Sequence, residues 1–347
     1  MTSKSNARCV SPHAAEIAAV GHAYPAESVG NDEFFARARY PLTGDRDRLV
    51  RSTRMRGRYW CGPEENTWTL ARSAAERALE TDPGLKDEID VVLAVSSTTI
   101  PYLYPPEAHR PGNGDLSALV IRDVLDRESC VGLDLKSCAC AGFVRAVQVM
   151  DGLLHDPNHR AGLIVCAEQT SRLAVADSNR STFCFILGDA AGAMVLRRTE
   201  RHDTEGRESG LIDHTGRLAP AGLDLIRFGD DGKSLVVRGE RAGEAIRQAM
   251  VSSARELLRR NHLAVTDVDW LLPIQAHVGI IQGLCEELRW PLEKLLWSAD
   301  VTGFSGSASI PAALADFVRR GVVRRGDLIL SPAAGAGING GAALYRY

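Results

Sequence analysis

Residues 135–150, LKSCACAGFVRAVQVM, place two cysteines one residue apart, immediately before a stretch with the apolar periodicity of a helix. The preceding CVGLDLK, residues 130–136, is typical of a strand, so a tight turn of small residues joins strand to helix. We expect Cys140 at the helix N-terminus, where unpaired N–H groups and the helix dipole favour the thiolate, and where small neighbours such as Gly142 let a substrate approach the sulfur. Cys138, at the strand end, is expected to pack in the core. Taken alone, the stretch also allows Cys140 to be a second core residue.

The composition is that of an ordinary globular protein. The 347 residues are 45% hydrophobic and 24% charged, carry a formal net charge of -3 at pH 7, and are enough for two packed domains. This balance lacks the concentrated basic face that nucleic-acid binding requires. No apolar run approaches the ~20 residues needed to cross a bilayer, and the N-terminal stretch lacks the apolar core of a signal peptide. We therefore expect a cytoplasmic protein that binds neither nucleic acid nor membrane.

The eight cysteines are scattered, and several lie in apolar runs such as LIVCAE and STFCFIL. In a cytosolic protein this distribution is typical of reduced, buried thiols. Cys138 and Cys140 could chelate a metal, but no second Cys/His pair lies near them at the spacing of a zinc site. We expect no metal site.

Strand-like and helix-like segments alternate along the chain, and this pattern occurs twice. In the first half, short apolar runs such as IDVVLAVSST alternate with amphipathic segments. Residues 197–222 are polar and glycine-rich, and we interpret them as the connection between two halves. The second half repeats the alternation and ends in a strand, a glycine-rich turn and a final strand at 327–347. The pattern predicts an α/β fold of two similar halves, residues 1–200 and 201–347, with a site where they meet.

Motifs spread over nearly the whole chain, from about Ile17 to Tyr347, follow one another in register: CACAGF at 138–143, FILGDAAGAMVL at 185–196, VDWLLPIQAH at 268–277, GFSGSASIPAALADFVRRG at 303–321 and GDLILSPAAGAGINGGAALYRY at 326–347. Together they resemble the β-ketoacyl-ACP synthase III family of the thiolase superfamily. The resemblance implies a duplicated five-layer α-β-α-β-α fold and a homodimer. It also implies that Cys140 is the nucleophile that takes an acyl group from a CoA or acyl-carrier-protein thioester, with no cofactor beyond that substrate.

The chain departs from the family at two paired positions. Ile274 stands where the family has its histidine, and Phe304 stands where it has its asparagine. Those side chains hold the enolate oxygen during decarboxylation, and loss of one such donor typically costs about 3–4 kcal/mol. The family's oxyanion hole instead uses backbone N–H groups, which here belong to Cys140 and Ala336 in the retained glycine-rich turn. We therefore expect acylation to be retained, standard decarboxylation to be lost, and Ile274 and Phe304 to line an apolar pocket.

His277 is the candidate base that remains. It stands three residues after Ile274, where the family motif has its final asparagine. If a helix begins there, residues three apart share a face, so His277 could point into the same cavity and deprotonate an acceptor or assist the thiol. The alternative is a helix-start histidine that only lines the tunnel or satisfies a backbone group.

Recognition of the acyl donor has also changed relative to the family. Arg48 and Arg51, in the basic stretch DRDRLVRSTRMRGRYW, could bind CoA phosphates, although a solvated charged loop is the alternative reading. The helix that carries basic residues for the acidic carrier protein has Gly279, Glu286 and Glu287 at those positions. Acidic residues there would slow encounter with an acidic carrier protein. The sequence leaves open whether CoA or a carrier protein delivers the acyl group.

Three functions are consistent with these residues. The leading hypothesis is a synthase-III-like acyltransferase of specialised metabolism, polyketide or fatty-acid-like, that passes the acyl group from Cys140 to an oxygen, nitrogen or carbon atom of a small-molecule acceptor. The second is a carbon–carbon condensing β-ketoacyl synthase with an atypical site. The third is a non-catalytic subunit that pairs with an active homologue, although such a subunit would have no need to keep Cys140.

Overall fold

The structure is a computed structural model, and it describes residues 13–39, 42, 45–98, 115–136, 139–175, 181–200, 210–230 and 234–347. Among these residues, no helix is both long and apolar enough to span a membrane. The same residues contain no group of three or more His, Cys, Asp or Glu side chains placed to hold a metal ion.

The first sheet contains five strands in the order β1-β7-β6-β4-β5. Strands β6, β4 and β5 are parallel, with β5 at the edge of the sheet, and β7 and β1 join antiparallel at the other side. The strands β4 and β6 are almost entirely apolar and buried, as expected for parallel strands covered on both faces. The bounds are β1 His13–Ala23, β4 Ile89–Val95, β5 Val131–Leu135, β6 Ala161–Glu168 and β7 Ala190–Glu200.

The second sheet contains four strands in the order β11-β12-β13-β8. β11 and β12 are parallel, whereas β13 pairs antiparallel with both β12 and β8. The bounds are β8 Gly210–Leu218, β11 Trp270–Leu271, β12 Leu328–Gly335 and β13 Asn339–Arg346. Each sheet takes its strands from one side of residue 200, although the division into domains 1–200 and 201–347 itself stays a prediction.

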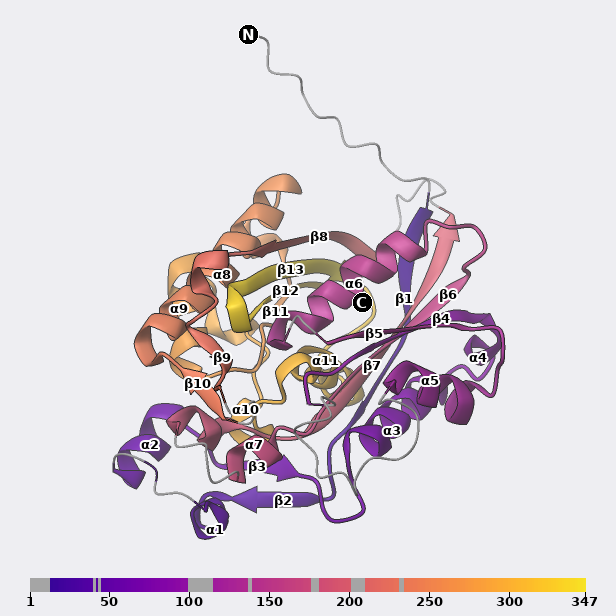
Figure 1. Ribbon diagram of the computed structural model, residues 1–347. Helices are drawn as coiled ribbons and strands as arrows, with labels where there is room; N and C mark the ends of the chain where they lie inside the picture. Colours follow the sequence, from indigo (N-terminus) through magenta and orange to yellow (C-terminus); the bar gives the residue numbers. More distant parts are fainter. Residues whose placement is uncertain are drawn as a thin grey trace.

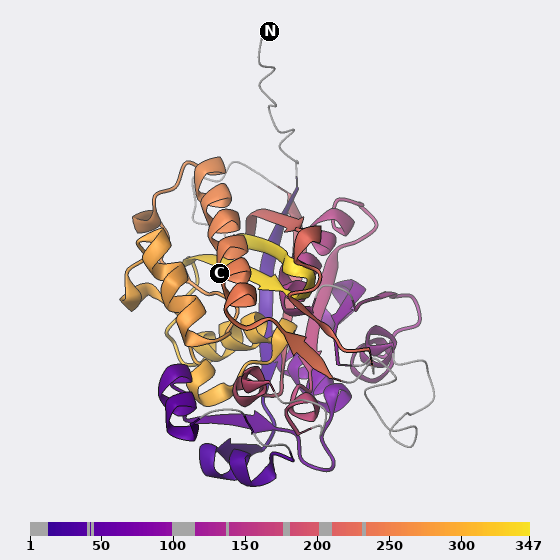
Figure 2. The ribbon, with the colours of Figure 1, turned by 60° about the vertical axis from the view of Figure 1, so that its left-hand side comes forward.

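Helices separate and cover the two sheets, which gives five layers (Figures 1 and 2). α8 packs on the outer face of the second sheet, with α9 beside it. α6 lies between the sheets and contacts both, and α11 packs on the inner face of the first sheet; α3 and α5 cover its outer face. The bounds are α3 Thr67–Leu79, α5 Leu116–Val120, α6 Gly142–Leu153, α8 Gly239–Arg260, α9 Val278–Leu288 and α11 Ser309–Arg319. This arrangement confirms the predicted duplicated α-β-α-β-α fold.

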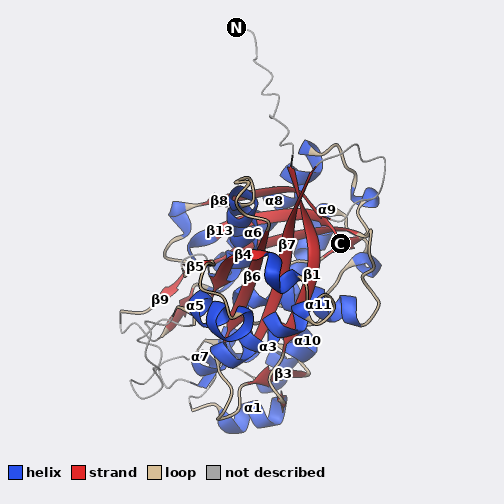
Figure 3. Cartoon of the chain, turned by 90° about the vertical axis from the view of Figure 1, so that its right-hand side faces the viewer, coloured by secondary structure: helices blue, strands red, loops and turns tan. Residues whose placement is uncertain are grey.

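Smaller elements complete the molecule, and Figure 3 shows them among the loops at the ends of the long strands. The antiparallel strands β2 and β3, with α1 and α2 between them in the chain, form one end of the molecule, next to α10 (Figure 1). The bounds are α1 Asn31–Arg37, α2 Arg46–Thr53, α4 Leu85–Glu88, α7 Ser171–Val175, α10 Ala299–Thr302, β2 Glu27–Gly30, β3 Gly57–Trp60, β9 Ile226–Phe228 and β10 Leu235–Val237. A π-helical turn, Ile121–Leu125, extends α5, and 3-10 turns at Ala139–Ala141, Thr182–Ile186, Gly306–Ala308 and Ala336–Ile338 surround the site described next.

Candidate functional site

The candidate site lies at the carboxyl ends of the three parallel strands of the first sheet. β4 leads into residues 96–98, β5 leads toward Cys140, and β6 ends at Glu168. Parallel strands present their carboxyl ends at one edge of a sheet, which is where α/β proteins build their sites. The sheet therefore brings Cys140 and Glu168, 28 positions apart in the chain, into one neighbourhood.

Cys140 lies in a 3-10 turn directly before α6, the place that the sequence predicts. Ala139 carries a positive φ of 43°, a left-handed conformation that a non-glycine residue adopts only when its surroundings impose it. Gly142, the first residue of α6, is needed for packing: a Cβ there would lie 2.4 Å from Val95 Cγ1 and 3.0 Å from Ser307 Cβ. The small size of Gly142 thus serves close helix packing, and the expectation that it opens a path to the sulfur stays a prediction. Cys138 lies outside the described residues.

The environment of Cys140 opposes the thiolate. Burial is the main cause that raises the pKa of the Cys140 thiol, to about 12, and the nearby Glu168 carboxylate raises it further. The expectation of a lowered pKa at the helix terminus is therefore wrong for the free protein, because desolvation and a like charge outweigh the helix N-terminus. At neutral pH the sulfur is a protonated thiol, and its proton must leave as the new bond forms.

Glu168 is a completely buried carboxylate that the sequence analysis missed. It accepts hydrogen bonds from the N–H and hydroxyl of Ser97, from the N–H and hydroxyl of Thr98, and from the hydroxyl of Ser307 at 2.6 Å. Burial raises the pKa of Glu168, while these donors act in the opposite direction. Glu168 thereby ties the ends of β4 and β6 to the loop that carries Phe304. The signal in the sequence is that Glu168 is the lone carboxylate at the end of the otherwise apolar strand AGLIVCAE. A charge buried in such a strand needs several hydrogen-bond donors around it.

Ile274 and Phe304 form part of an apolar interior. Their exposed fractions are 1% and 2%, and neither lines the surface hollows beside β5, beside α2 or beside the C-terminal Tyr347. The Phe304 N–H donates to the carbonyl of Ile186 at 2.7 Å, and its ring meets Phe183 edge-on with centroids 5.9 Å apart. Both side chains lack a hydrogen-bond donor, so the site has no side-chain donor at either of these positions.

His277 is the N-cap of α9. Its Nδ1 accepts a hydrogen bond from the Gly279 N–H at 3.0 Å, and burial lowers the pKa of its imidazole. A neutral ring that accepts at Nδ1 carries its proton at Nε2. The structure thus gives His277 the backbone-satisfying contact named as the alternative in the sequence analysis. Among the described contacts, no hydrogen bond joins His277 to Cys140.

The glycine-rich turn between β12 and β13 lies against the cysteine turn, since both strands contact Ala139–Ala141. Ala336 is half-buried within an otherwise buried run. Gly337 has a φ of 71° and Ile338 a φ of 49°, and the second value is a rare one for a β-branched residue. The structure therefore brings together Cys140 and the segment of Ala336, the two proposed backbone donors.

α2 carries both residues predicted to bind phosphates, Arg48 and Arg51. Arg51 lines a surface hollow of about 540 Å³, whose other lining residues are Asn31, Asp32, Phe35, Arg46, Asp47, Val50 and Arg56. Arg48 is exposed and does not line this hollow. α2 also contacts α9, so the hollow lies near the helix that His277 caps. On α9, Glu287 pairs with Arg247 of α8 at 3.0 Å, which offsets part of the acidic charge expected to repel a carrier protein.

Comparisons with known proteins agree with this geometry. Two family models match the chain: 3-oxoacyl-[acyl-carrier-protein] synthase III over residues 133–212, and the C-terminal part of the same family over residues 258–347. A β-ketoacyl-[acyl-carrier-protein] synthase III of Erythrobacter litoralis is 32% identical over 343 residues, which cover 96% of this chain and 99% of the relative.

Solved structures give the same result. The crystal structure of 3-oxoacyl-[acyl-carrier-protein] synthase III from Aquifex aeolicus has a TM-score of 0.81 at 25% identity and covers 96% of this chain and 100% of its own. The priming β-ketosynthase of the R1128 polyketide pathway has a TM-score of 0.79 at 26% identity, over 96% of each chain. The resemblance inferred from the motifs is confirmed. The chain therefore belongs to the β-ketoacyl-[acyl-carrier-protein] synthase III family of acyl-transferring enzymes.

Proposed function

We propose that this chain moves an acyl group from a CoA or acyl-carrier-protein thioester, through acyl-Cys140, to an oxygen, nitrogen or carbon acceptor in specialised metabolism. One observation carries the proposal. The cysteine turn and the glycine-rich turn are retained and adjacent, while Ile274 and Phe304 are apolar at the two positions that hold the family's side-chain donors. Acylation depends on backbone donors, whereas decarboxylation depends on the side chains that are gone.

Acylation balances as a thioester exchange. The Cys140 sulfur forms a bond to the thioester carbonyl carbon, the bond from that carbon to the donor sulfur breaks, and the Cys140 proton leaves with the donor thiol. In this proposal the N–H groups of Cys140 and Ala336 bind the oxygen that becomes negative in the transition state. In the second half, the acceptor bonds to the acyl carbon, the bond from that carbon to the Cys140 sulfur breaks, and the acceptor's proton returns to that sulfur.

His277 enters this proposal as a hydrogen-bond donor. With Nδ1 occupied by the Gly279 N–H, the neutral ring offers Nε2–H, which suits an acyl or acceptor oxygen. The base role inferred from the sequence requires the other tautomer, which would break the cap of α9. The donor role is therefore the one that the resting geometry supports.

Acyl-adduct and carbon dioxide measurements test the proposal. The protein and its Cys140→Ala variant are incubated with a panel of acyl-CoA and acyl-carrier-protein thioesters, with and without carboxyl-labelled malonyl-CoA. We expect an intact-mass acyl adduct that is absent from Cys140→Ala, with label release at background. Robust label release that depends on Cys140 would instead support a condensing synthase, the activity in the names of the relatives. A wild-type protein that takes no acyl group would support the non-catalytic subunit.

We also propose a homodimer that forms along β5. This strand has a sheet neighbour on one side only among the described residues, and Val131 and Leu133 on it are 41% and 38% exposed. A hollow of about 1080 Å³ borders the same strand and α5. An unpaired edge with exposed apolar residues is a surface that a second copy covers. Light scattering should give a dimer for wild type and a monomer for Leu133→Lys. The control is Leu292→Lys, which should remain a dimer because Leu292 is 61% exposed and does not lie on β5. A monomeric wild type would refute this arrangement.

A further inference from the structure

Arg145 connects the helix behind the nucleophile to the turn that supplies the second backbone donor. It lies in the first turn of α6, and its Nε and one terminal nitrogen donate to Asn339 Oδ1 at 3.0 and 2.6 Å. The same terminal nitrogen lies 3.3 Å from the carbonyl oxygen of Gly340, and the other donates to Gln148 at 3.0 Å. Asn339 and Gly340 are the first two residues of β13, immediately after the turn of Ala336–Ile338.

The neighbouring strand leaves room for this contact. Arg145 passes β8 at Gly216, where a Cβ would lie 1.6 Å from the guanidinium nitrogen, so every other residue at this position would displace the arginine. Gly216 pairs with Gly341 in the sheet, beside the Asn339 and Gly340 that Arg145 contacts. The hydrogen-bond acceptors of Arg145 are amide and carbonyl oxygens, and among the described residues no carboxylate forms an ion pair with this arginine. Arg145 is half-buried and thus bridges α6 and β13 through neutral partners.

The segment that Arg145 holds is strained. Ile338, the residue before Asn339, has a φ of 49°, and a β-branched residue keeps such a conformation only where its surroundings over-determine it. The carbonyl of Ile338 accepts the Ala219 N–H at 3.1 Å on one side, and Arg145 grips Asn339 on the other. The contacts of Arg145 are therefore well placed to fix the direction of the Ala336 N–H.

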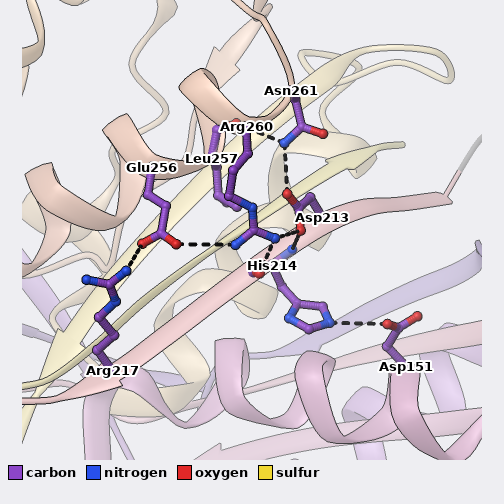
Figure 4. Close-up of polar contacts among 8 residues, drawn as sticks. All are labelled: Asp151, Asp213, His214, Arg217, Glu256, Leu257, Arg260 and Asn261. Atoms are coloured by element: carbon purple, nitrogen blue, oxygen red, sulfur yellow. Dashed lines mark hydrogen bonds and ion pairs between the residues drawn. The ribbon is translucent and has the colours of Figure 1, made fainter. Parts of the chain in front are cut away.

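A second polar anchor holds the far end of the same helix. Asp151 of α6 contacts His214 of β8 with Nε2 and Oδ2 3.1 Å apart, in a network that continues through Asp213 to Arg260 on α8 (Figure 4). Figure 4 shows that the network also includes Arg217, Glu256, Leu257 and Asn261. This anchor joins α6 to the same sheet through Asp151, whose side-chain and carbonyl hydrogen bonds among the described residues go to His214 and His155. It provides a matched control for a purely structural effect on α6.

We infer that Arg145 is a positioning residue that holds the oxyanion turn against Cys140 by gripping Asn339 and Gly340. The inference rests on the proposed acylation of Cys140, because it assigns Arg145 to the transition state of that step. A donor misplaced by about 1 Å can cost on the order of 10²-fold in rate, even when the altered residue does not touch the substrate. Loss of the grip should therefore slow acylation and leave the reactivity of the thiol itself unchanged.

The experiment compares two reactions of the same sulfur. Acylation by acetyl-CoA and octanoyl-CoA needs the oxyanion donors, whereas alkylation by iodoacetamide needs only thiolate and access; both are followed by mass mapping of the Cys140 peptide. For Arg145→Met we expect acylation about 30- to 100-fold slower and alkylation within about twofold of wild type. Arg145→Lys should be acylated almost as slowly as Arg145→Met, since an ammonium cannot replace the two parallel donors of the guanidinium. Asp151→Asn should change neither rate by more than about twofold.

The outcomes separate this inference from the proposed function. Equal acylation by wild type and Arg145→Met, or acylation and alkylation that fall together, would overturn the positioning role while acyl transfer stands. Hydrogen exchange of residues 335–340 needs no substrate and should be faster in Arg145→Met than in Asp151→Asn. If wild type accepts no acyl group, the proposed function fails, and faster exchange in Arg145→Met still supports the grip on the turn. Equal exchange in the two variants overturns the grip.

Discussion

The substitution Glu168→Gln removes the carboxylate whose charge raises the pKa of the Cys140 thiol. Burial and Glu168 together raise that pKa from 9 to about 12, and burial is the larger cause. A backbone hydrogen bond at Cys140 acts in the opposite direction, and neutralising Glu168 should remove the smaller of the two raising causes and lower the pKa of the thiol. Below the pKa, the thiolate fraction rises about tenfold for each unit by which the pKa falls, so Cys140 should be alkylated faster in Glu168→Gln at pH 8.

The variant fits the site without leaving backbone donors unpaired. The side-chain oxygen of the introduced glutamine can keep the N–H groups of Ser97 and Thr98, both 3.1 Å from Glu168 Oε2. Its amide nitrogen then faces the hydroxyls of Ser97 and Ser307, which can rotate to accept. The matched control is Asp189→Asn, because Asp189 is an equally buried carboxylate held by Ser171 and Cys61 and is not among the causes of the Cys140 shift.

The assay is the iodoacetamide alkylation rate of the Cys140 peptide between pH 7 and 10. The wild-type rate should rise about tenfold per pH unit with no plateau in this range, because the thiol remains protonated far below its pKa of about 12. Glu168→Gln should give a parallel line displaced to faster rates, and Asp189→Asn should overlie wild type. A wild-type plateau below pH 9, or a Glu168→Gln line that coincides with wild type, would refute the electrostatic reasoning.

Three further outcomes follow from the site. His277→Ala should lose the α9 cap and about 0.5–2 kcal/mol of unfolding free energy in denaturant titrations, whereas His277→Asn should keep the cap; acyl transfer should be slower in both variants if Nε2–H donates to substrate, and a wild-type rate in His277→Asn would leave His277 as a cap alone. Gly142→Ala should destabilise the fold by about 1–3 kcal/mol, read as a lower thermal midpoint, because the added Cβ meets Val95. Arg51→Ala should raise the KM for acyl-CoA in a salt-dependent manner, and Arg48→Ala, outside the hollow, should leave KM unchanged. A KM that rises in Arg48→Ala and not in Arg51→Ala would show that the phosphates bind outside that hollow.

The sequence predicted those features that depend on local patterns. Buried strands such as Ile89–Val95 and the cysteine turn before α6 follow from apolar periodicity and small residues, and the family resemblance that the motifs carry implied the five layers. The direction of the Cys140 pKa shift was mispredicted, because helix position is a local property whereas desolvation and the field of Glu168 arise only on folding. Arg145 gave no local signal either, since its partner Asn339 lies 194 positions away in the chain.

The two halves of the family reaction depend on different kinds of donor, and this chain has changed only one kind. Side-chain donors disappear with a single substitution, as at Ile274 and Phe304. Backbone donors persist through substitution as long as the turn that aims them persists, and here two non-glycine residues with positive φ, Ala139 and Ile338, lie within those turns. Strain at both turns must be maintained by their surroundings, at about 1–3 kcal/mol for each residue. A subunit with no catalytic role would not need strained turns beside a cysteine, so the retained strain favours continued acylation of Cys140.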